Sequence, residues 1–343
     1  MSEQRRARPQ LAHVAKAANV SISTASACLR DVPGPSDSTR ERVKEIAAQL
    51  GYRTNLQAKA LRDGQLSTVA FVFDPVILEG HPRAARLFWQ RFVNAIISTL
   101  TDEGIALLML PAESIESLRG AAIDAVILAA LPEEATASRR VGFGIPVVAA
   151  GTPRPGVVAS CYAGHDVETM HRIGLDLLRE GGAQRIALIP NISLERVSYE
   201  SSVYRNWCDE NNMEATVIEL DSVHDTEVAK SVIESAVESG VDAFLIRNGD
   251  AQVVLAGIAQ SGRRVPEDVQ IVSESEGTID SLTHPPVTTV SLMGRESGRI
   301  IGEEVIHQIR NPKLVSTKRP RHLSLPYELT IRESTRVTPA ADA

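Results

Sequence analysis

Serine and threonine side chains gather in residues 19–30, which read NVSISTASACLR. Their spacing predicts a helix that is capped by Ser21 and runs to about Arg30, because a serine oxygen can accept the amide hydrogens that a first helical turn leaves unpaired. Hydroxyl groups at the start of a helix also suit hydrogen bonds to the phosphates of a nucleic acid. The stretch therefore raises the hypothesis of a helix that contacts DNA.

The charge distribution agrees with this hypothesis, although the whole chain carries a net charge of -7. Residues 1–64 hold 11 Lys and Arg against 6 Asp and Glu, and the rest of the chain holds 25 against 37. A basic head on an acidic body suggests that only the head meets a polyanion. The same imbalance also fits a solvated helical head, so charge alone leaves both interpretations open.

Helices are predicted on either side of residues 21–30. An apolar face predicts a helix over 11–18, and Asn19 and Val20 connect it to the next. Ser36 caps a third helix, which Gly51 ends. Helices joined in this way make a helix-turn-helix arrangement. The following segment, 55–64, is about two turns long and needs a partner to stay helical.

From Ser67 onward, strand-like apolar runs alternate with helical segments near 84–102, 166–180, 196–211, 225–239 and 251–261. The strand-like runs are STVAFVFD, IALLML, AVILAA, PVVAAG, RIALIP, ATVIEL, AFLIRN and VQIVSE. Such alternation predicts an α/β core of two lobes, each with a doubly wound parallel sheet and with a ligand cleft at the strand ends.

Composition excludes several classes of protein. The apolar runs are too short to cross a bilayer, and no apolar signal core follows the basic N-terminus. Cys28, Cys161 and Cys208 have neither paired nor metal-like spacing, which favours a reduced cytoplasmic protein without a disulfide scaffold or zinc site. We expect a cytoplasmic protein without a membrane partner.

These motifs, in their order, resemble the LacI/GalR family of transcription regulators from about Leu11 to Thr335. The stretch VAKAANVSISTASACLRDVPGPSDSTRERVKEIAAQLGYRTNLQAKAL resembles the family's head nearly end to end, and RRVPEDVQIV, PPVTTV and LPYELTIREST match three further family blocks. The resemblance implies a helix-turn-helix head, a hinge helix and a two-lobed core like that of type I periplasmic sugar-binding proteins. It also implies a homodimeric repressor that binds a pseudo-palindromic operator in double-stranded DNA.

By this resemblance the chain divides into a head, a hinge and two discontinuous lobes. The head is 1–54, and the hinge helix and linker are 55–66. The N-terminal lobe is 67–163 plus 291–318, and the C-terminal lobe is 164–290 plus 319–343.

The resemblance also assigns DNA contacts. Ile22, Ser23 and Ala27 are expected to face base edges, although Ile22 and Ala27 could instead be packed. The alanine lacks the reach of the arginine or histidine that is common at its position, so it can only touch a thymine methyl or make no contact. Leu61 corresponds to the leucine that wedges into the minor groove, with burial in the core as the alternative. The full expected set is Ser21, Ile22, Ser23, Thr24, Ser26, Ala27, Thr39, Arg40, Asn55, Ala58, Lys59 and Leu61.

The expected effector cleft departs from the family pattern. Glu200 stands where sugar-binding members have an arginine, and Asn248 stands where they have an aspartate, unless the alignment slides to Asp250. The family's GFDD is replaced by SESE, which gives Ser275 and Glu276. A charge reversal changes which ligand charge is tolerated, so the effector is either unusual, such as a cation, or absent. The side chains expected around the cleft are Asp74, Arg154, Asp166, Arg196, Glu200, Trp207, Asn248 and Glu276.

Two other classes of protein fit the sequence less well. A solute receptor without a DNA-binding role is the main alternative, and the head argues against it. An enzyme is not expected, because the sequence lacks GxSxG, GxxxxGK[ST], GxGxxG and HExxH, and its histidines are scattered. We therefore expect no catalytic residues, no cofactor and no metal.

Overall fold

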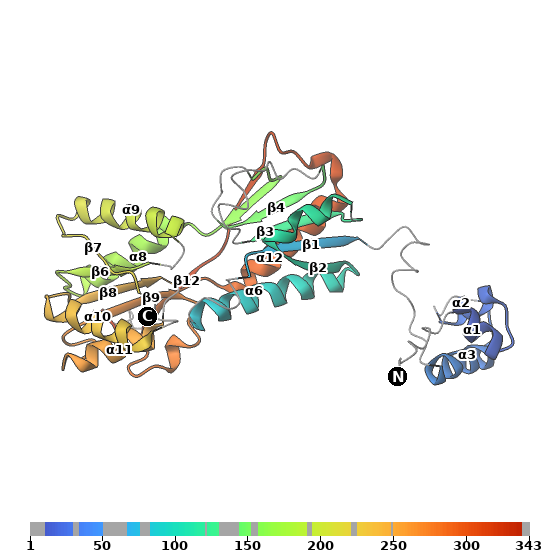
Figure 1. The fold of residues 1–343 in the computed structure, drawn as a ribbon, viewed down its shortest axis with the longest axis horizontal. Helices are drawn as coiled ribbons and strands as arrows, with labels where there is room; N and C mark the ends of the chain where they lie inside the picture. The colour runs from blue at the N-terminus through green and yellow to red at the C-terminus, as the bar shows by residue number, and fades with distance from the viewer. Residues whose placement is uncertain are drawn as a thin grey trace, which may run out of the picture. The chain divides into compact units, whose positions relative to one another are not determined.

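The computed structural model describes residues 11–29, 34–50, 67–75, 83–120, 122–129, 144–151, 157–190, 194–220, 225–247 and 250–337. They belong to two compact units, the head (residues 1–66) and the core (residues 67–343). Figure 1 shows the helices of the head and the two sheets of the core.

In the described part of the head, three helices pack around a small apolar centre. They are α1 (Leu11–Ala17), α2 (Ile22–Leu29) and α3 (Asp37–Gln49). Asn19 turns the chain between α1 and α2 with a positive φ of 50°, which asparagine tolerates better than most residues. The buried apolar residues are Val14, Ala15, Ala18, Ala25, Cys28, Val43 and Ala47. The predicted helix-turn-helix arrangement is therefore confirmed.

The first lobe of the core holds a parallel sheet in the order β11-β5-β4-β3-β1-β2. Its described strands are β1 (Thr68–Phe73), β2 (Ala106–Pro111), β3 (Ala125–Ala129), β4 (Val147–Ala150), β5 (Cys161–Gly164) and β11 (Arg321–Ser324). Two long helices, α6 (Arg83–Asp102) and α12 (Gly294–Arg310), pack on one face, and the 3-10 helix η1 (Ala112–Gly120) packs on the other. β1 and β3 are apolar on both faces because both faces are covered there, whereas β2 and β11 at the sheet edges are partly exposed.

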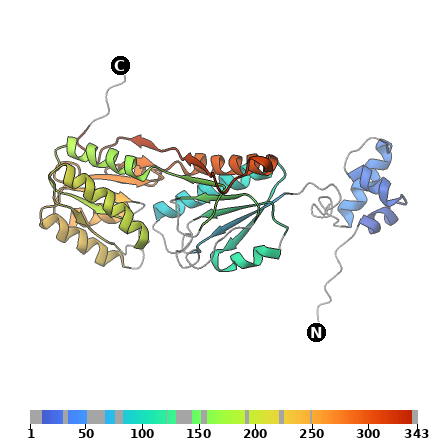
Figure 2. The ribbon, with the colours of Figure 1, turned by 90° about the horizontal axis from the view of Figure 1, so that it is seen from above.

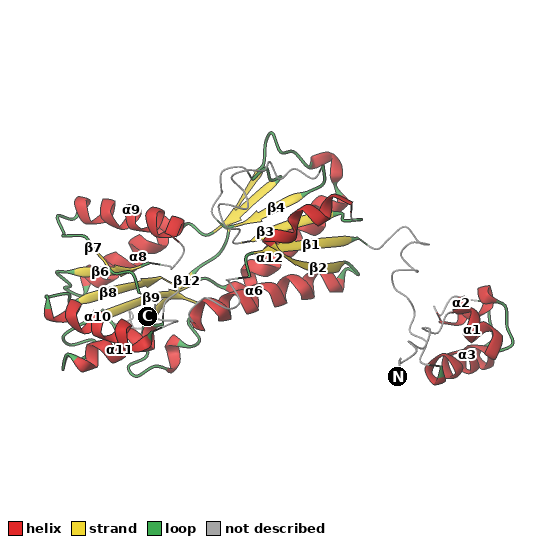
Figure 3. Cartoon of the chain, in the orientation of Figure 1, coloured by secondary structure: helices red, strands yellow, loops and turns green. Residues whose placement is uncertain are grey.

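The second lobe holds a sheet in the order β12-β10-β9-β8-β6-β7, parallel except where β10 meets β12. Its described strands are β6 (Ile186–Ile189), β7 (Thr216–Val217), β8 (Ala243–Arg247), β9 (Gln270–Ser275), β10 (Thr288–Ser291) and β12 (Glu328–Thr330). Four helices cover it, namely α8 (Val167–Glu180), α9 (Leu194–Glu210), α10 (Thr226–Glu238) and α11 (Ala251–Gln260). Figures 1 and 3 show α8 and α9 on one side of this sheet and α10 and α11 on the other.

The helices expected near 84–102, 166–180, 196–211, 225–239 and 251–261 are confirmed within a few residues. One expected boundary is wrong. Arg321–Ser324 was assigned to the C-terminal lobe, but β11 pairs with β5 in the first sheet. The chain thus returns to the first lobe for α12 and β11 and crosses again before β12.

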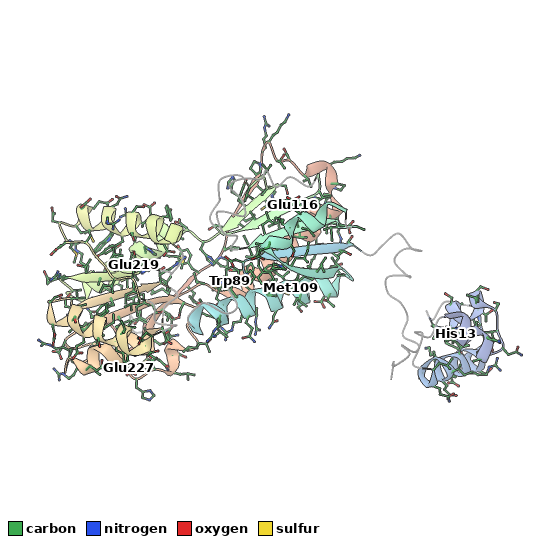
Figure 4. All side chains as sticks on the ribbon, viewed as in Figure 1. His13, Trp89, Met109, Glu116, Glu219 and Glu227 are labelled. Carbon is green, nitrogen blue, oxygen red and sulfur yellow. The ribbon has the colours of Figure 1, made fainter. Side chains whose placement is uncertain are left out.

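Glycines set the distance between α6 and α12. Gly294, Gly298 and Gly302 recur every fourth residue and so lie on one face of α12. A Cβ atom added at Gly298 would lie 2.2 Å from the carbonyl oxygen of Phe92, and one at Gly302 would lie 2.9 Å from Thr99. The two helices therefore touch backbone to backbone. Figure 2 shows them side by side, and Figure 4 labels Trp89 on α6.

Short hydrogen bonds join the segments that cross between the lobes. Leu325 N donates to the carbonyl oxygen of Gly164 at 2.9 Å, and His165 Nε2 lies 2.8 Å from the carbonyl oxygen of Leu292. One buried apolar cluster also runs through both lobes, from the α6 and α12 face of the first to the α8 and α9 face of the second. No helix in the described part of the chain is long and apolar enough to span a membrane.

Candidate nucleic-acid interface and ligand cleft

The start of α2 is built on a hydroxyl cap. Thr24 N donates to Ser21 Oγ at 3.0 Å, and the hydroxyls of Ser23 and Thr24 both lie 2.7 Å from the same oxygen. This network occupies Ser21 with the helix backbone, which fixes the direction of the first turn. Ser21 is thereby a residue that positions the helix, as the sequence predicted.

The first turn of α2 presents Ile22 and Ser23 to solvent. Ile22 is 55% exposed, a large value for an isoleucine, so the alternative that it is only packed does not hold. Ala27, later in the same helix, is half-buried, and Ser26 is only 8% exposed. Ser26 belongs to the expected set of DNA contacts, but its burial leaves it little surface for such a contact.

The start of α3 repeats the construction of α2. Ser36 caps the helix by accepting from Thr39 N, and its hydroxyl lies 2.8 Å from Thr39 Oγ1. Arg40 follows at the first turn and is half-buried. Thr39 and Arg40 thus lie at the N-terminal end of α3, where unpaired amides and the helix dipole favour an anion.

Several expected site residues lie outside the described residues. They are Asn55, Ala58, Lys59 and Leu61 of the hinge and Arg154 and Asn248 of the cleft, and the side chain of Arg196 is also not described.

In the core, Glu200 belongs to a buried ionic network at the ends of β8 and β9. Arg247 NH1 lies 2.6 Å from Glu274 Oε2, and Arg247 Nε lies 3.2 Å from Glu200 Oε1. His171 Nδ1 lies 2.7 Å from the other oxygen of Glu274. All four side chains are at most 6% exposed. We call these four residues the buried tetrad.

Strand alternation explains why the tetrad forms there. Ala243, Leu245 and Arg247 share one face of β8, and Arg247 is in register with Glu274 of β9. The first two are apolar and pack against α8 and α9, whereas the last layer of that face is charged. Because parallel strands end at the same edge, the charges collect at the carboxyl edge of the sheet, where α/β folds bind ligands.

Glu274 and Arg247 are stabilised in their charged forms despite burial. Burial acts to raise the pKa of Glu274, but His171 and Arg247 outweigh it and hold that pKa below its ordinary value of 4.5. For Arg247, burial acts to lower the pKa, and Glu200 and Glu274 raise it instead. The carboxylate of Glu200 is therefore already compensated by an arginine of the same lobe.

Glu276 occupies a different place, between the lobes. Its Oε1 lies 2.9 Å from Arg91 NH1 of α6, and its Oε2 accepts from Gly294 N, the first residue of α12, at 2.9 Å. The Glu276 side chain is 5% exposed. It also lines a small hollow of about 220 Å³ whose other walls include Thr289, Thr330 and Arg332.

The remaining expected cleft residues serve local structure. Asp166 caps α8 by accepting from Thr169 N at 3.0 Å, and the amide and hydroxyl of Thr169 lower its pKa. Trp207 is 1% exposed and donates to Asp176, so it is a core residue of α9 rather than a cleft residue, which corrects the expectation. Asp74 follows β1 and is half-buried.

Sequence reasoning missed Arg91, His171, Arg247 and Glu274 as site residues. For Arg247 a signal existed, since it is the one charged residue of the strand AFLIR. Glu274 lies among other polar residues in QIVSES, so its signal is weaker. No such signal marks Arg91 or His171, because each lies on an amphipathic helix among other polar residues. Within the described ranges, no group of histidine, cysteine, aspartate and glutamate could hold a metal ion.

Comparison with known proteins agrees with both units. Residues 10–55 match the bacterial regulatory proteins of the lacI family, and residues 175–335 match a periplasmic binding protein-like domain. The transcriptional regulator CelR of Thermobifida fusca is 29% identical over 96% of this chain and 99% of its own length. The regulator pepR1 of Lactobacillus delbrueckii subsp. lactis is 27% identical over 94% of this chain and 96% of its own length.

Solved structures share the fold. A Lac repressor dimer bound to operator and the anti-inducer ONPF superposes with a TM-score of 0.75 at 19% identity, covering 96% of this chain and 99% of that one. A complex of the regulator CelR with cellobiose superposes with a TM-score of 0.61 at 25% identity, covering 95% of this chain and 100% of that one.

Proposed function

Because the chain is a DNA-binding transcriptional regulator of the lacI family and not an enzyme, we propose that it acts as a homodimeric repressor whose operator affinity is set by its two-lobed core. The observation that carries this proposal is the exposed first turn of α2, where Ile22 and Ser23 stand on the cap made by Ser21. A dimer brings two such turns to successive major grooves of a pseudo-palindromic site. The solved relative that is a dimer on its operator supports this arrangement.

In this proposal each contact has its own role. Ile22 and Ser23 read base edges, Thr24, Thr39 and Arg40 hold phosphates, and Ala27 adds no hydrogen bond. The hinge residues Asn55, Ala58, Lys59 and Leu61 bind the minor groove. Half-site preference then rests on Ile22, Ser23 and DNA shape.

Selection of binding sites from random duplex DNA, with the intact protein, tests this proposal. The expected result is a two-fold symmetric site with no fixed guanine opposite Ala27. Light scattering should give the mass of a dimer, both free and on DNA. A monomer that binds a single asymmetric site would contradict the proposal, as would a strongly required guanine opposite Ala27.

We further propose that the core takes an effector other than a typical sugar, or none. The support is the buried tetrad, because Glu200 and Glu274 are already paired with Arg247. A neutral sugar would have to displace charged partners from one another to bind them, and unpaired buried charges are costly. The internal pairing also means that a cation would have to compete with Arg247 for Glu200.

A thermal-shift screen tests this second part. Its arms are neutral sugars including cellobiose, which is present in the CelR complex, then amines, nucleosides and phosphorylated metabolites. Stabilisation by a neutral sugar that saturates at micromolar concentration would refute the proposal.

The protein is expected in the cytoplasm, where operator DNA lies.

A further inference from the structure

Glu276 bonds the second lobe to both long helices of the first. It follows β9, which belongs to the second sheet. Its two oxygens accept from Arg91 on α6 and from the backbone amide of Gly294 on α12, each at 2.9 Å. A charge-assisted hydrogen bond of this kind is roughly twice as strong as a neutral one.

The place of this contact makes it more than a surface ion pair. Glu276 is 8% exposed as a whole residue, and Arg91 keeps a third of its side chain in solvent. Gly294 admits the carboxylate because it has no side chain, since a Cβ there would lie 2.9 Å from Glu276 Oε2. The chain crosses from the second lobe to the first just before Gly294, so the contact lies beside this crossover.

We propose that Glu276 is an interlobe latch, a positioning residue whose bonds to Arg91 and Gly294 hold the two lobes in the arrangement that the structure shows. Glu276 was expected to bind an effector, but its carboxylate binds Arg91 and Gly294 of the same chain. This arrangement of the lobes then needs no ligand, and the link from lobe position to operator affinity rests on the function proposed above. A change that breaks the latch shifts the population toward other arrangements of the lobes.

Distance measurement between the lobes tests this without DNA. Cys28, Cys161 and Cys208 are buried, so spin labels can be placed on Ser98→Cys in α6 and Ser235→Cys in α10, which are both exposed. The labelled full chain is diluted with unlabelled protein so that only distances within one protomer are recorded. Electron–electron resonance should give one narrow distance distribution for the otherwise unchanged protein.

Glu276→Gln and Arg91→Met should each add a second population of distances. The double variant should add no more than either single variant, because all three lose the same contact. Arg91→Lys should restore much of the narrow distribution, which a merely structural defect in α6 would not allow. Glu210→Gln, which removes an ion pair inside the second lobe, is the matched control and should leave the distribution narrow.

Operator affinity is then measured for the same variants. Glu276→Gln, Arg91→Met and the double variant should change it by one common factor. Unchanged distance distributions in Glu276→Gln and Arg91→Met would overturn the latch, and so would effects that multiply in the double variant. If the latch holds but no variant binds DNA differently, the link to operator affinity fails and the distance result stands.

Discussion

Arg247 and Glu274 face each other from adjacent strands of the second sheet, with 2.6 Å between NH1 and Oε2 and almost no exposure of either side chain. Together with Glu200 and His171 they place charge where the layers below are apolar. A buried ion pair is weak evidence for added stability, but removing one partner leaves the other charge without compensation. The stability of the tetrad therefore depends on all of its charged partners being present.

Arg247→Met should destabilise the core strongly. Loss of one partner of a buried pair costs about 3–5 kcal/mol, and here one arginine compensates two carboxylates. Urea unfolding followed by circular dichroism measures the loss. Arg172→Met breaks an exposed pair with Glu210 and should change the midpoint little. Equal losses in the two variants would show that the tetrad is not a stabilising unit.

Glu274 should make stability fall in acid. Its pKa in the folded state lies below 4.5, because His171 and Arg247 outweigh the effect of burial. Its charge thus contributes stability that is complete above the unfolded-state pKa and is lost as pH falls through the lower, folded-state value. The stability difference between the unchanged protein and Glu274→Gln should stay constant from pH 6 to about 5 and shrink as the pH is lowered further through the folded-state pKa. A difference that stays constant below about pH 5 contradicts the assignment.

Gly298→Ala should loosen the first lobe. The new methyl group would lie 2.2 Å from the carbonyl oxygen of Phe92, and backbone cannot move aside as a flexible side chain does. Overpacking of this kind costs about 1–3 kcal/mol, which urea unfolding would show. Arg295→Ala, on the exposed side of the same helix, is the control and should leave the midpoint nearly unchanged.

Ser36→Ala should destabilise the head alone. The serine hydroxyl accepts from Thr39 N at the start of α3, and loss of such a cap costs about 1 kcal/mol. Hydrogen exchange should therefore quicken in α1 to α3 while the core stays protected. Glu45→Gln, at an exposed position of the same helix away from the cap, serves as the control. Faster exchange throughout the core in Ser36→Ala would mean that the two units do not unfold independently.

Leu61→Ala should weaken specific binding to the operator more than nonspecific binding to DNA. An inserted leucine side chain contributes on the order of 1.5 kcal/mol or more, so operator affinity should fall about tenfold or more. Nonspecific affinity depends on phosphate contacts and should change little. Fluorescence anisotropy with operator and scrambled duplexes compares the two. An equal loss on both duplexes would remove the wedge hypothesis.

The elements that the sequence predicted are those with a clear period. The apolar stripes of α6, α8, α10 and α11 and the long runs of β1, β3 and β9 all appear close to their expected bounds. Missed elements lacked that signal. β5, with the sequence CYAG, is short and contains no β-branched residue, and α12 carries three glycines that lower its intrinsic helix propensity. Tertiary packing on α6 overrides that propensity.

The contacts of the candidate site likewise divide into those that the sequence predicted and those that it did not. Caps at Ser21 and Ser36 were predictable because they depend on residues a few positions apart. The pairing of Glu200 with Arg247 was not, because it joins α9 to the end of β8. The charge reversal at Glu200 was therefore interpreted as a change in the charge of the ligand. The structure shows a partner whose charge offsets it, and such compensation is invisible to a position-by-position comparison.

The pairing of β11 with β5 sets an order of events during synthesis. The first lobe lacks an edge strand and α12 until the second lobe has almost wholly left the ribosome, since α12 and β11 follow β10 in the chain. Its apolar face along α6 must stay uncovered for that time, and late pairings of this kind are slow to form. Neither lobe can be made from one contiguous stretch of gene. A premature stop after α12 would remove β11 and β12, and so damage both lobes at once.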